Sequence, residues 1–301
     1  MLDDFRNMAV AVNGITINAV QAGSGPALLL MHGHPQTHAI WHKVGPTLAR
    51  HFSVVASDLR GYGDSGKPAG LPDHSNYSKR QMASDQIELM RKLGFTTFSV
   101  VGHDRGGRVG ARMALDFPEA VEKLVTLDIA PTLAMYEQTN QDFARAYWHW
   151  FFLIRPAPFP ETLIRANPDL YLKQTMGARK AGLAPFTQAA YAEYLRCLHD
   201  PATAHGMCED YRASATIDLE HDHADRNAGH KIACPVLALW GAEGTIEKCF
   251  DPLEEWRRVA ANVSGESLPC GHYIPEEAPE LLLERILPFL RKSTSALDGV
   301  K

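Results

Sequence analysis

The sequence of 301 residues lacks the long apolar runs and the targeting segments that would place a chain in or across a membrane. No apolar stretch approaches the roughly 18 residues that a transmembrane helix needs. Residues 1–6 carry neither the basic nor the apolar region of a signal peptide. Internal repeats and low-complexity segments are also missing. We therefore expect a globular protein of the cytoplasm, with no membrane partner.

Cysteine is scarce, and its five positions follow no pattern. Their number is odd and none of them forms a C-x-x-C pair, so neither a disulfide framework nor a zinc site is predicted. The five are Cys197, Cys208, Cys234, Cys249 and Cys270. We expect reduced thiols and no bound metal.

A large excess of charge of one sign is missing as well. The 30 Lys and Arg residues face 35 Asp and Glu residues, which leaves a net charge of −5 at pH 7. A protein that binds nucleic acid or an anionic membrane through its overall charge is basic. Neither is therefore expected as a partner. The hydrophobic content of 45% is enough for one large core.

Short apolar runs alternate with helical patterns along much of the chain. Asn13 and Gly14, between two β-rich runs, predict a hairpin, and Ser78 with Gln81 three residues later predicts a capped helix. Strands are predicted at residues 27–31, 53–57, 98–101, 124–127, 236–240 and 263–267. Strands that alternate with helices indicate the α/β class, with a mostly parallel, doubly wound sheet.

The stretch GHDRG at residues 102–106 carries the first chemical signal. It follows the predicted strand at 98–101 and precedes a helical pattern at 111–117, which Pro118 stops. The pattern G-x-Ser-x-G in this context is the nucleophile elbow, a sharp turn that lifts the central side chain clear of the sheet. Here Asp104 stands at the centre, so the predicted nucleophile is a carboxylate. A lone G-x-D-x-G also occurs in ordinary turns, so its neighbours must decide.

The order of these neighbours is that of a catalytic triad. Asp128 follows the predicted strand at 124–127, and His272 stands in a loop before a helix that starts near Pro279. The order Asp104, Asp128, His272 is nucleophile, acid and histidine, as in α/β hydrolases. Upstream, the loop His32-Gly33-His34-Pro35 follows the predicted strand at 27–31 and can aim a backbone N–H into the site. We predict these residues at one edge of the sheet.

Residues 131–229 interrupt the alternation of strands and helices. They are rich in aromatic side chains, carry prolines at 156, 158 and 160, and contain no convincing strand. We predict an α/β-hydrolase core over residues 1–130 and 230–301, with a helical cap inserted at residues 131–229. A second helical domain with no part in the site is the alternative.

An aspartate nucleophile predicts alkyl transfer rather than the acyl transfer of a serine enzyme. A carboxylate that displaces a leaving group from an sp³ carbon forms an ester. His272 would then activate a water that attacks the Asp104 carbonyl carbon, while Asp128 orients the imidazole. The backbone N–H groups of His34 and Arg105 are the expected oxyanion donors.

Three segments resemble the haloacetate (fluoroacetate) dehalogenases of the α/β-hydrolase superfamily. They are HDRGGR at residues 103–108, YWHW at 147–150 and CEDYR at 208–212, and the resemblance runs from about residue 14 to 289. It implies a homodimeric hydrolase with a helical cap that cleaves the carbon–halogen bond of a 2-haloacid, without cofactor or metal. It also implies Asp128 as the triad acid. Many α/β hydrolases instead place the acid after a later strand, near Glu243, so that alternative stays open.

The expected substrate-binding residues follow from the same segments. Arg105 and Arg108 lie one and four residues beyond the nucleophile, where a helix start and a guanidinium fork both suit a carboxylate. The resemblance implies that His149, Trp150 and Tyr211 donate to the departing halide. From composition alone, the aromatic residues at 147–150 are more typical of an ordinary core, and only the match to the family segments favours a binding role.

Two positions depart from the family pattern. His34 stands where a phenylalanine is usual, and Ala178 stands near the place of a tryptophan. Because His34 is polar and Ala178 is small, we expect a changed and roomier pocket that favours chloroacetate, bromoacetate or bulkier 2-haloacids. An epoxide hydrolase with the same aspartate, using Tyr211 as a donor, is the rival enzyme. A hydrolase fold that only binds a partner is the non-enzymatic rival.

Overall fold

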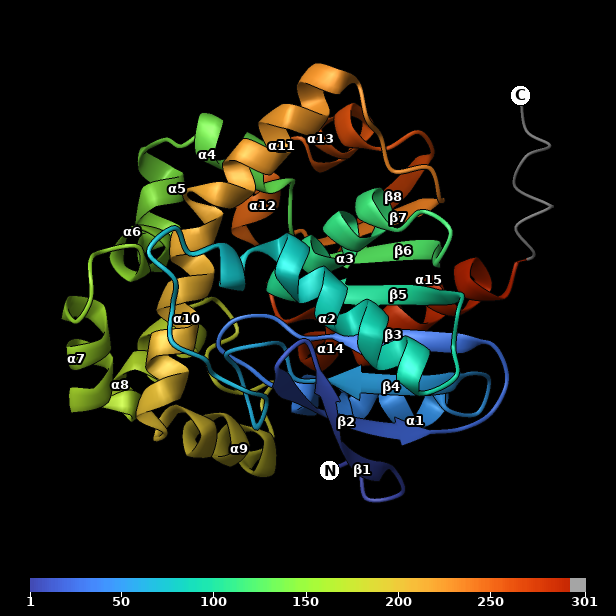
Figure 1. Ribbon diagram of the computed structural model, residues 1–301, viewed down its shortest axis with the longest axis horizontal. Coiled ribbons are helices and arrows are strands. Elements are labelled where there is room, and N and C mark those ends of the chain that lie inside the picture. Colours follow the sequence, from blue (N-terminus) through green and yellow to red (C-terminus); the bar gives the residue numbers. More distant parts are fainter. Residues whose placement is uncertain (293–301) are drawn as a thin grey trace.

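Eight strands form one sheet at the centre of the computed structural model, which describes residues 1–292 (Figure 1). The strands are β1 Arg6–Val12, β2 Ile15–Ala22, β3 Ala27–Met31, β4 Ser53–Ser57, β5 Phe98–His103, β6 Val121–Leu127, β7 Val236–Gly241 and β8 Val263–Leu268. Their order in the sheet is β1-β2-β4-β3-β5-β6-β7-β8. The pairs β1–β2 and β2–β4 are antiparallel, and the rest of the sheet is parallel. The mostly parallel sheet and the hairpin at Asn13 are confirmed.

Strand β3 shows why the apolar runs predicted the strands. Alternate residues point to opposite faces, so Leu28 and Leu30 join one apolar cluster while Leu29 and Met31 join the other. All four are fully buried because helices cover both faces of the sheet. The strands at 27–31 and 53–57 match the prediction, and the other four are longer than predicted by one to three residues.

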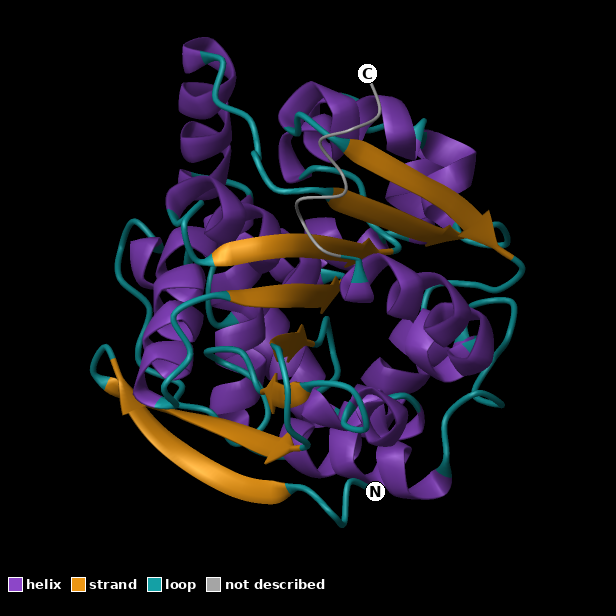
Figure 2. Cartoon of the chain, turned by 90° about the vertical axis from the view of Figure 1, so that its right-hand side faces the viewer, coloured by secondary structure: helices purple, strands orange, loops and turns teal. Residues whose placement is uncertain are grey.

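Helices from the core cover the two faces of the sheet (Figures 1 and 2). One layer contains α2 Lys79–Lys92, α3 Arg105–Asp116 and α13 Pro252–Val259; the other contains η1 His38–Lys43, α1 Gly45–Leu48, α14 Ile274–Glu277 and α15 Pro279–Arg291. Two shorter elements are η2 Ser75–Tyr77 and α12 Thr245–Cys249. The predicted cap of α2 is confirmed, since the Ser78 side chain accepts from the backbone N–H of Gln81 at 3.1 Å.

Between β6 and β7 the chain forms helices and turns. We call residues 131–229 the cap segment. Its elements are α4 Thr132–Glu137, α5 Gln141–Ala146, α6 Trp148–Leu153, α7 Phe159–Ala166, α8 Pro168–Leu172, η3 Lys173–Gly177, α9 Gln188–Leu198, α10 Pro201–Ser214 and α11 Ile217–Ala228. Figure 1 shows that they lie beyond the ends at which the parallel strands finish. The three segments that carry the predicted triad, after β5, β6 and β8, therefore lie at the end of the sheet that faces the cap segment.

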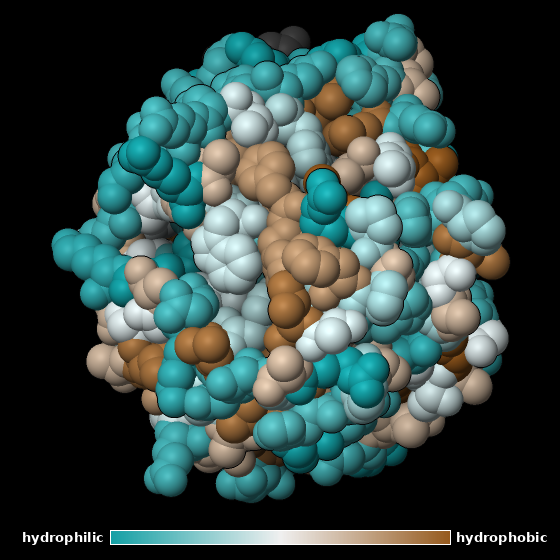
Figure 3. Space-filling model, turned by 90° about the vertical axis from the view of Figure 1, so that its left-hand side faces the viewer, coloured by the Kyte–Doolittle hydropathy of each residue, from teal (hydrophilic) through white to brown (hydrophobic). Residues whose placement is uncertain are grey.

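The outer face of the cap segment is partly apolar. Figure 3 shows apolar groups gathered in bands between polar ones on this side of the molecule. Phe159 and Leu163 of α7 and Leu170 of α8 are each about half exposed. No helix within residues 1–292 is both long and apolar enough to cross a membrane.

Candidate active site

The turn after β5 has the geometry of a nucleophile elbow. Asp104 has φ of +45° and ψ of −112°, a backbone conformation that residues other than glycine rarely adopt. Helix α3 begins at the next residue. Gly106 lets this turn approach the neighbouring strand, because a Cβ atom there would lie 2.3 Å from the Met31 carbonyl oxygen. The strand–turn–helix predicted around Asp104 is confirmed.

The loop after β3 lies directly against this aspartate. A Cβ atom on Gly33 would lie 2.4 Å from the Asp104 Cβ, so only glycine lets the loop come this close. The backbone N–H of His34 donates to Asp104 Oδ1 at 3.0 Å. The His34 amide is therefore placed at the carboxylate where negative charge would develop in an attack on an Asp104 ester.

Asp128 and His272 form the second part of the predicted triad. His272 Nδ1 donates to Asp128 Oδ2 at 2.5 Å, and the Gly241 amide donates to the other carboxylate oxygen at 2.8 Å. His103 Nε2 donates to the His272 carbonyl at 2.8 Å and fixes the loop. With its proton on Nδ1, the imidazole of His272 keeps Nε2 free to accept a proton.

Glu243, the other candidate for the acid, lies elsewhere. Its carboxylate is 39% exposed and forms an ion pair with Lys180 at 2.9 Å. Asp128, in contrast, is fully buried and touches the histidine. The geometry therefore favours Asp128 as the partner of His272.

Burial and neighbouring charges set the protonation of the site. Burial alone would raise the pKa of Asp104, but His272, Arg108 and Arg105 hold it well below its usual range. Burial, with the Arg179 charge as the next cause, lowers the pKa of His272 well below 6.5. At neutral pH the site therefore contains an ionised Asp104 carboxylate and a neutral His272 imidazole, which are the states that displacement and general-base catalysis require.

Arg105 is fixed by a carboxylate that the sequence analysis did not single out. Its Nε and Nη2 atoms donate to the two carboxylate oxygens of Asp210 at 2.8 and 2.7 Å. Asp210 also accepts from the Tyr62 hydroxyl at 2.7 Å and pairs with Lys79. The two Arg105 nitrogens that could bind a ligand carboxylate side by side are thus already bonded to Asp210. Only Nη1 of Arg105 remains, buried and without a partner in the described part of the chain.

Arg108 is held mainly by neutral groups. Its Nη1 donates to the Ala130 carbonyl at 3.0 Å and to the Thr132 hydroxyl at 2.9 Å, and its guanidinium lies 4.9 Å from the centre of the Trp150 ring. Within residues 1–292 no carboxylate comes within 4.0 Å of it, and its Nε is buried without a partner. Arg108 therefore brings a positive charge that no ion pair within the described chain neutralises.

The three residues expected to bind a halide do come together. His149 and Trp150 lie on α6 and Tyr211 on α10, and the Tyr211 ring meets the other two edge-on at 5.8 and 6.0 Å. Neither Trp150 Nε1 nor the Tyr211 hydroxyl has a partner within residues 1–292. These closely spaced aromatic side chains are buried as in an ordinary core. Unlike the polar groups of an ordinary core, however, two of their hydrogen-bond donors have no partner in the described chain.

His34 completes this wall with an unusual polar ring. Its imidazole stacks on that of His149 and meets the Tyr211 ring edge-on at 5.2 Å. Its Nε2 bonds the Tyr171 hydroxyl at 2.9 Å, whereas its Nδ1 is buried and unpartnered in the described chain. Burial lowers the pKa of His34 to about 3, so the ring is neutral. The effect of His34 on the substrate pocket stays a prediction.

The expectation that the small side chain of Ala178 makes the pocket roomier is wrong. Ala178 is exposed, so its small side chain enlarges no pocket. The next residue, Arg179, turns inward instead, and its guanidinium lies 5.3 and 5.4 Å from the ring centres of Tyr147 and Tyr273. Sequence analysis missed this third arginine because the segment after η3 has no regular periodicity that shows which side chain faces the site.

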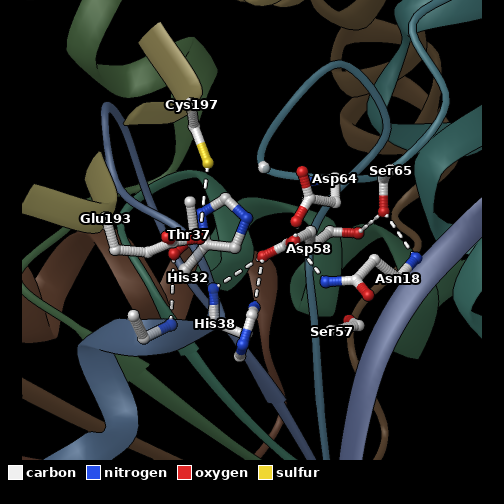
Figure 4. A network of polar contacts seen from close by, with 12 residues as sticks. Asn18, His32, Thr37, His38, Ser57, Asp58, Asp64, Ser65, Glu193 and Cys197 are labelled. Carbon is white, nitrogen blue, oxygen red and sulfur yellow. Dashed lines mark hydrogen bonds and ion pairs between the residues drawn. The ribbon is translucent and has the colours of Figure 1, made fainter. Parts of the chain in front are cut away.

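A network of polar contacts holds the loop that carries His34 (Figure 4). Asp58, which follows β4, accepts from both the backbone N–H and Nδ1 of His38 at 2.8 Å and from Asn18 at 2.8 Å. The Leu59 amide donates to His32 Nε2 at 3.0 Å. Although burial acts in the opposite direction, Asp58 raises the pKa of His38. The segment after β4 is thus a support for the loop beside the nucleophile.

Within residues 1–292, no three His, Cys, Asp or Glu side chains are grouped so that they could hold a metal ion. The site instead offers an ionised carboxylate, a neutral imidazole and buried N–H and O–H donors. Such a set suits displacement at carbon, followed by hydrolysis of the resulting ester.

Comparison with known proteins agrees with this geometry. The family described as the alpha/beta hydrolase fold matches residues 26–279. Fluoroacetate dehalogenase from Burkholderia sp. is 47% identical over 298 residues, which are 99% of this chain and 97% of that protein. Soluble epoxide hydrolase from Corynebacterium sp. (strain C12) is 35% identical over 285 residues, covering 92% of this chain and 94% of that protein.

A solved structure is similar over nearly the whole chain. ALR0039 from Nostoc sp. PCC 7120 has a TM-score of 0.95 and 55% sequence identity, and the match covers 97% of this chain and 100% of that chain. The resemblance to the fluoroacetate dehalogenases is confirmed. The chain belongs to the α/β-hydrolase family.

Proposed function

We propose that this protein hydrolyses haloacetates, converting fluoroacetate or chloroacetate to glycolate and halide through an ester on Asp104. The observation that carries the proposal is the set of buried donors around Asp104 that have no partner within residues 1–292: Arg105 Nη1, Arg108 Nε, Trp150 Nε1, Tyr211 Oη and His34 Nδ1. Buried donors are normally paired. A small anion with a halogen would supply acceptors for them.

The first step is displacement at the α-carbon. A carboxylate oxygen of Asp104 forms a bond to that carbon while the carbon–halogen bond breaks and the halide leaves with the electron pair. Arg105 and Arg108 hold the substrate carboxylate, so that the α-carbon faces the nucleophile. The Asp104 carboxylate is ionised at neutral pH because, against the effect of burial, the positive charges of Arg108 and Arg105 help to hold its pKa well below its usual range.

The leaving halide is stabilised by donors from the cap segment. His149, Trp150 and Tyr211 are the proposed donors, as in the family that the sequence resembles. Fluoride needs such donors most, because it is the poorest leaving group among the halides. The pKa of Tyr211 is raised well above 10 by burial, so its hydroxyl keeps its proton and can donate.

The second step is hydrolysis of the ester. His272 Nε2 takes a proton from water, the hydroxide attacks the Asp104 carbonyl carbon, and Asp128 stabilises the imidazolium that forms. The oxyanion accepts a hydrogen bond from the backbone N–H of His34, and the backbone N–H of Arg105 is the second proposed donor. Collapse releases the glycolate oxygen, which takes the proton from His272. Asp104 is left as a carboxylic acid and returns to the carboxylate by losing its proton to solvent, so that one proton is released with each glycolate and halide.

Halide release and glycolate formation from fluoroacetate, chloroacetate and bromoacetate test the proposal. Release from fluoroacetate would support the donor role of His149, Trp150 and Tyr211. Release from the heavier halides alone would keep the Asp104 chemistry with a weaker halide site. No release from any of the three would contradict the proposal.

One observation favours a second candidate, an epoxide hydrolase. Tyr147 and Tyr211 both have buried hydroxyls without a partner in the described chain, and a pair of such donors could protonate an epoxide oxygen. The positive charge of Arg108 argues for an anionic substrate instead. Turnover of a neutral epoxide such as styrene oxide, with no halide release from haloacetates, would favour this candidate.

A further inference from the structure

Arg179 occupies a different part of the site from the other two arginines. Arg105 lies 4.1 Å from the centre of the Tyr211 ring and Arg108 lies 4.9 Å from that of Trp150, both on the wall proposed to bind the halide. Arg179 lies over Tyr147 and Tyr273 instead. Those two rings flank His272, with centroids 6.2 and 4.8 Å from the imidazole. Arg179 thus brings a positive charge to the His272 side of the site.

No carboxylate within residues 1–292 comes within 4.0 Å of the Arg179 guanidinium, although Lys180 beside it forms an ion pair with Glu243 at the surface. The Nε atom of Arg179 is buried and unpartnered within that range. Arg179 is half-buried, and its positive charge faces no carboxylate within the described residues. A partly desolvated guanidinium with a free buried N–H is typical of a place where an anion binds.

Two further donors lie at the same place. The hydroxyls of Tyr147 and Tyr273 are buried and have no partner within the described residues, and both rings carry the Arg179 guanidinium over their faces. Burial raises the pKa of both hydroxyls well above 10, so both keep their protons. Arg179 and Tyr147 come from the cap segment and Tyr273 from the core. A carboxylate with its two oxygens can accept from such a cluster.

We infer that Arg179, Tyr147 and Tyr273 form an anion subsite that binds a second carboxylate of the substrate, so that the protein accepts short 2-halo dicarboxylic acids. This rests on the proposed function. In that function the α-carboxylate takes Arg105 and Arg108, and the halide takes the wall of His149, Trp150 and Tyr211. A monocarboxylate therefore leaves the Arg179 cluster without a ligand.

The reaction of such a diacid is the same balanced sequence. Asp104 displaces chloride from C2 of 2-chlorosuccinate, the chloride leaves with the bonding electron pair, and water hydrolyses the ester to a 2-hydroxy diacid. The distal carboxylate stays unchanged and serves only for binding. The Arg179 subsite thus determines specificity and takes no part in bond breaking.

The test compares kcat/KM for 2-chlorosuccinate with kcat/KM for chloroacetate in the full-length protein. In Arg179→Met the ratio of the two should fall about 30-fold, which is the usual effect of one charged hydrogen bond. Arg179→Lys should recover part of the ratio, and Tyr147→Phe should lower it about fivefold. The inhibition constant of succinate against chloroacetate turnover should rise in Arg179→Met, which provides a second readout that does not depend on diacid turnover.

Three outcomes decide the matter. A ratio that is unchanged in Arg179→Met, with the acid limb of the pH profile displaced for both substrates, would show that Arg179 acts only on His272 and would overturn the inference. Turnover of chloroacetate without any of 2-chlorosuccinate by the unaltered protein would also overturn it, while leaving the proposed function standing. Turnover of neither would contradict the proposed function itself.

Discussion

The imidazole of His34 stacks on that of His149, with ring centroids 5.6 Å apart and planes only 7° from parallel. Two neutral imidazoles therefore lie side by side, and the resemblance described above implies a phenylalanine as the usual residue at the place of His34. His34 Nε2 and the Tyr171 hydroxyl share a hydrogen bond of 2.9 Å, and in the tautomer in which the hydroxyl donates, the proton of His34 lies on Nδ1. In that tautomer His34 would add an N–H donor to the proposed halide site.

His34→Phe should remove this donor and keep the stacking. We expect kcat/KM for fluoroacetate to fall about tenfold more than kcat/KM for bromoacetate, because fluoride depends most on hydrogen bonds. Tyr171→Phe is the matched control, since it removes the bond to Nε2 and leaves the ring of His34 in place. Equal losses for both halides in His34→Phe would contradict a donor role.

Asp210 should matter strongly for the stability of the fold. It pairs with Arg105 and Lys79, and all three side chains are buried. Asp210→Asn would leave two buried cations without their carboxylate, so we expect the free energy of unfolding to fall by about 3 to 5 kcal/mol. Ser214→Ala, which removes one contact of Arg105 and no charge, should have a much smaller effect. Denaturant unfolding measures both. A loss below about 1 kcal/mol in Asp210→Asn would contradict the argument.

Glu276 should make the fold less stable as pH rises. Its carboxyl group bonds Gln36 Nε2 at 2.5 Å and the Tyr194 hydroxyl at 3.1 Å, with His42 Nδ1 at 3.8 Å, and burial raises its pKa to about 8. Because the folded protein holds this proton between pH 4.5 and 8 and the unfolded chain does not, the free energy of unfolding falls as pH rises through that range.

Glu276→Gln should flatten that dependence. We expect the decrease in unfolding free energy between pH 5 and pH 8 to shrink by roughly 3 kcal/mol relative to the unaltered protein. Glu280→Gln on the exposed face of α15 is the control and should leave the slope as it is. An unchanged slope in Glu276→Gln would show that this carboxyl group is ionised in the fold.

Much of the fold and the elbow could be predicted because they depend on neighbouring residues. Buried parallel strands give apolar runs, so β3 and β4 were found to the residue. The strained turn at Asp104 needs glycines at fixed offsets and can be recognised from five letters. Asp128 and His272 were found from chain order, and the structure joins them by a hydrogen bond.

The missed residues act through contacts that are distant in sequence. Asp210 stands in a segment that the resemblance quoted, but nothing local shows that it engages Arg105, which lies 105 positions away. In the segment after η3, the side chain that faces inward is that of Arg179, and the small residue Ala178 beside it is exposed. A short π-helix followed by turns has no 3.6-residue period, so the sequence could not show which of two adjacent side chains faces inward.

His272→Asn should separate the two chemical steps. Without the base, the ester on Asp104 should form and persist, so mass spectrometry of the protein after incubation with bromoacetate should show an added carboxymethyl group on the peptide that contains Asp104. Asp104→Asn is the control, because it should lose turnover by about 10⁴-fold or more and gain no such mass. An unmodified His272→Asn protein would contradict the role of His272.

The most direct test of the ester mechanism is a single turnover in ¹⁸O-labelled water, with enzyme in excess over chloroacetate. Because water attacks the Asp104 carbonyl carbon, the label should enter the Asp104 carboxylate, and the glycolate hydroxyl should carry the unlabelled oxygen of the enzyme. Label in the glycolate hydroxyl with none in Asp104 would show direct displacement by water and would contradict the account.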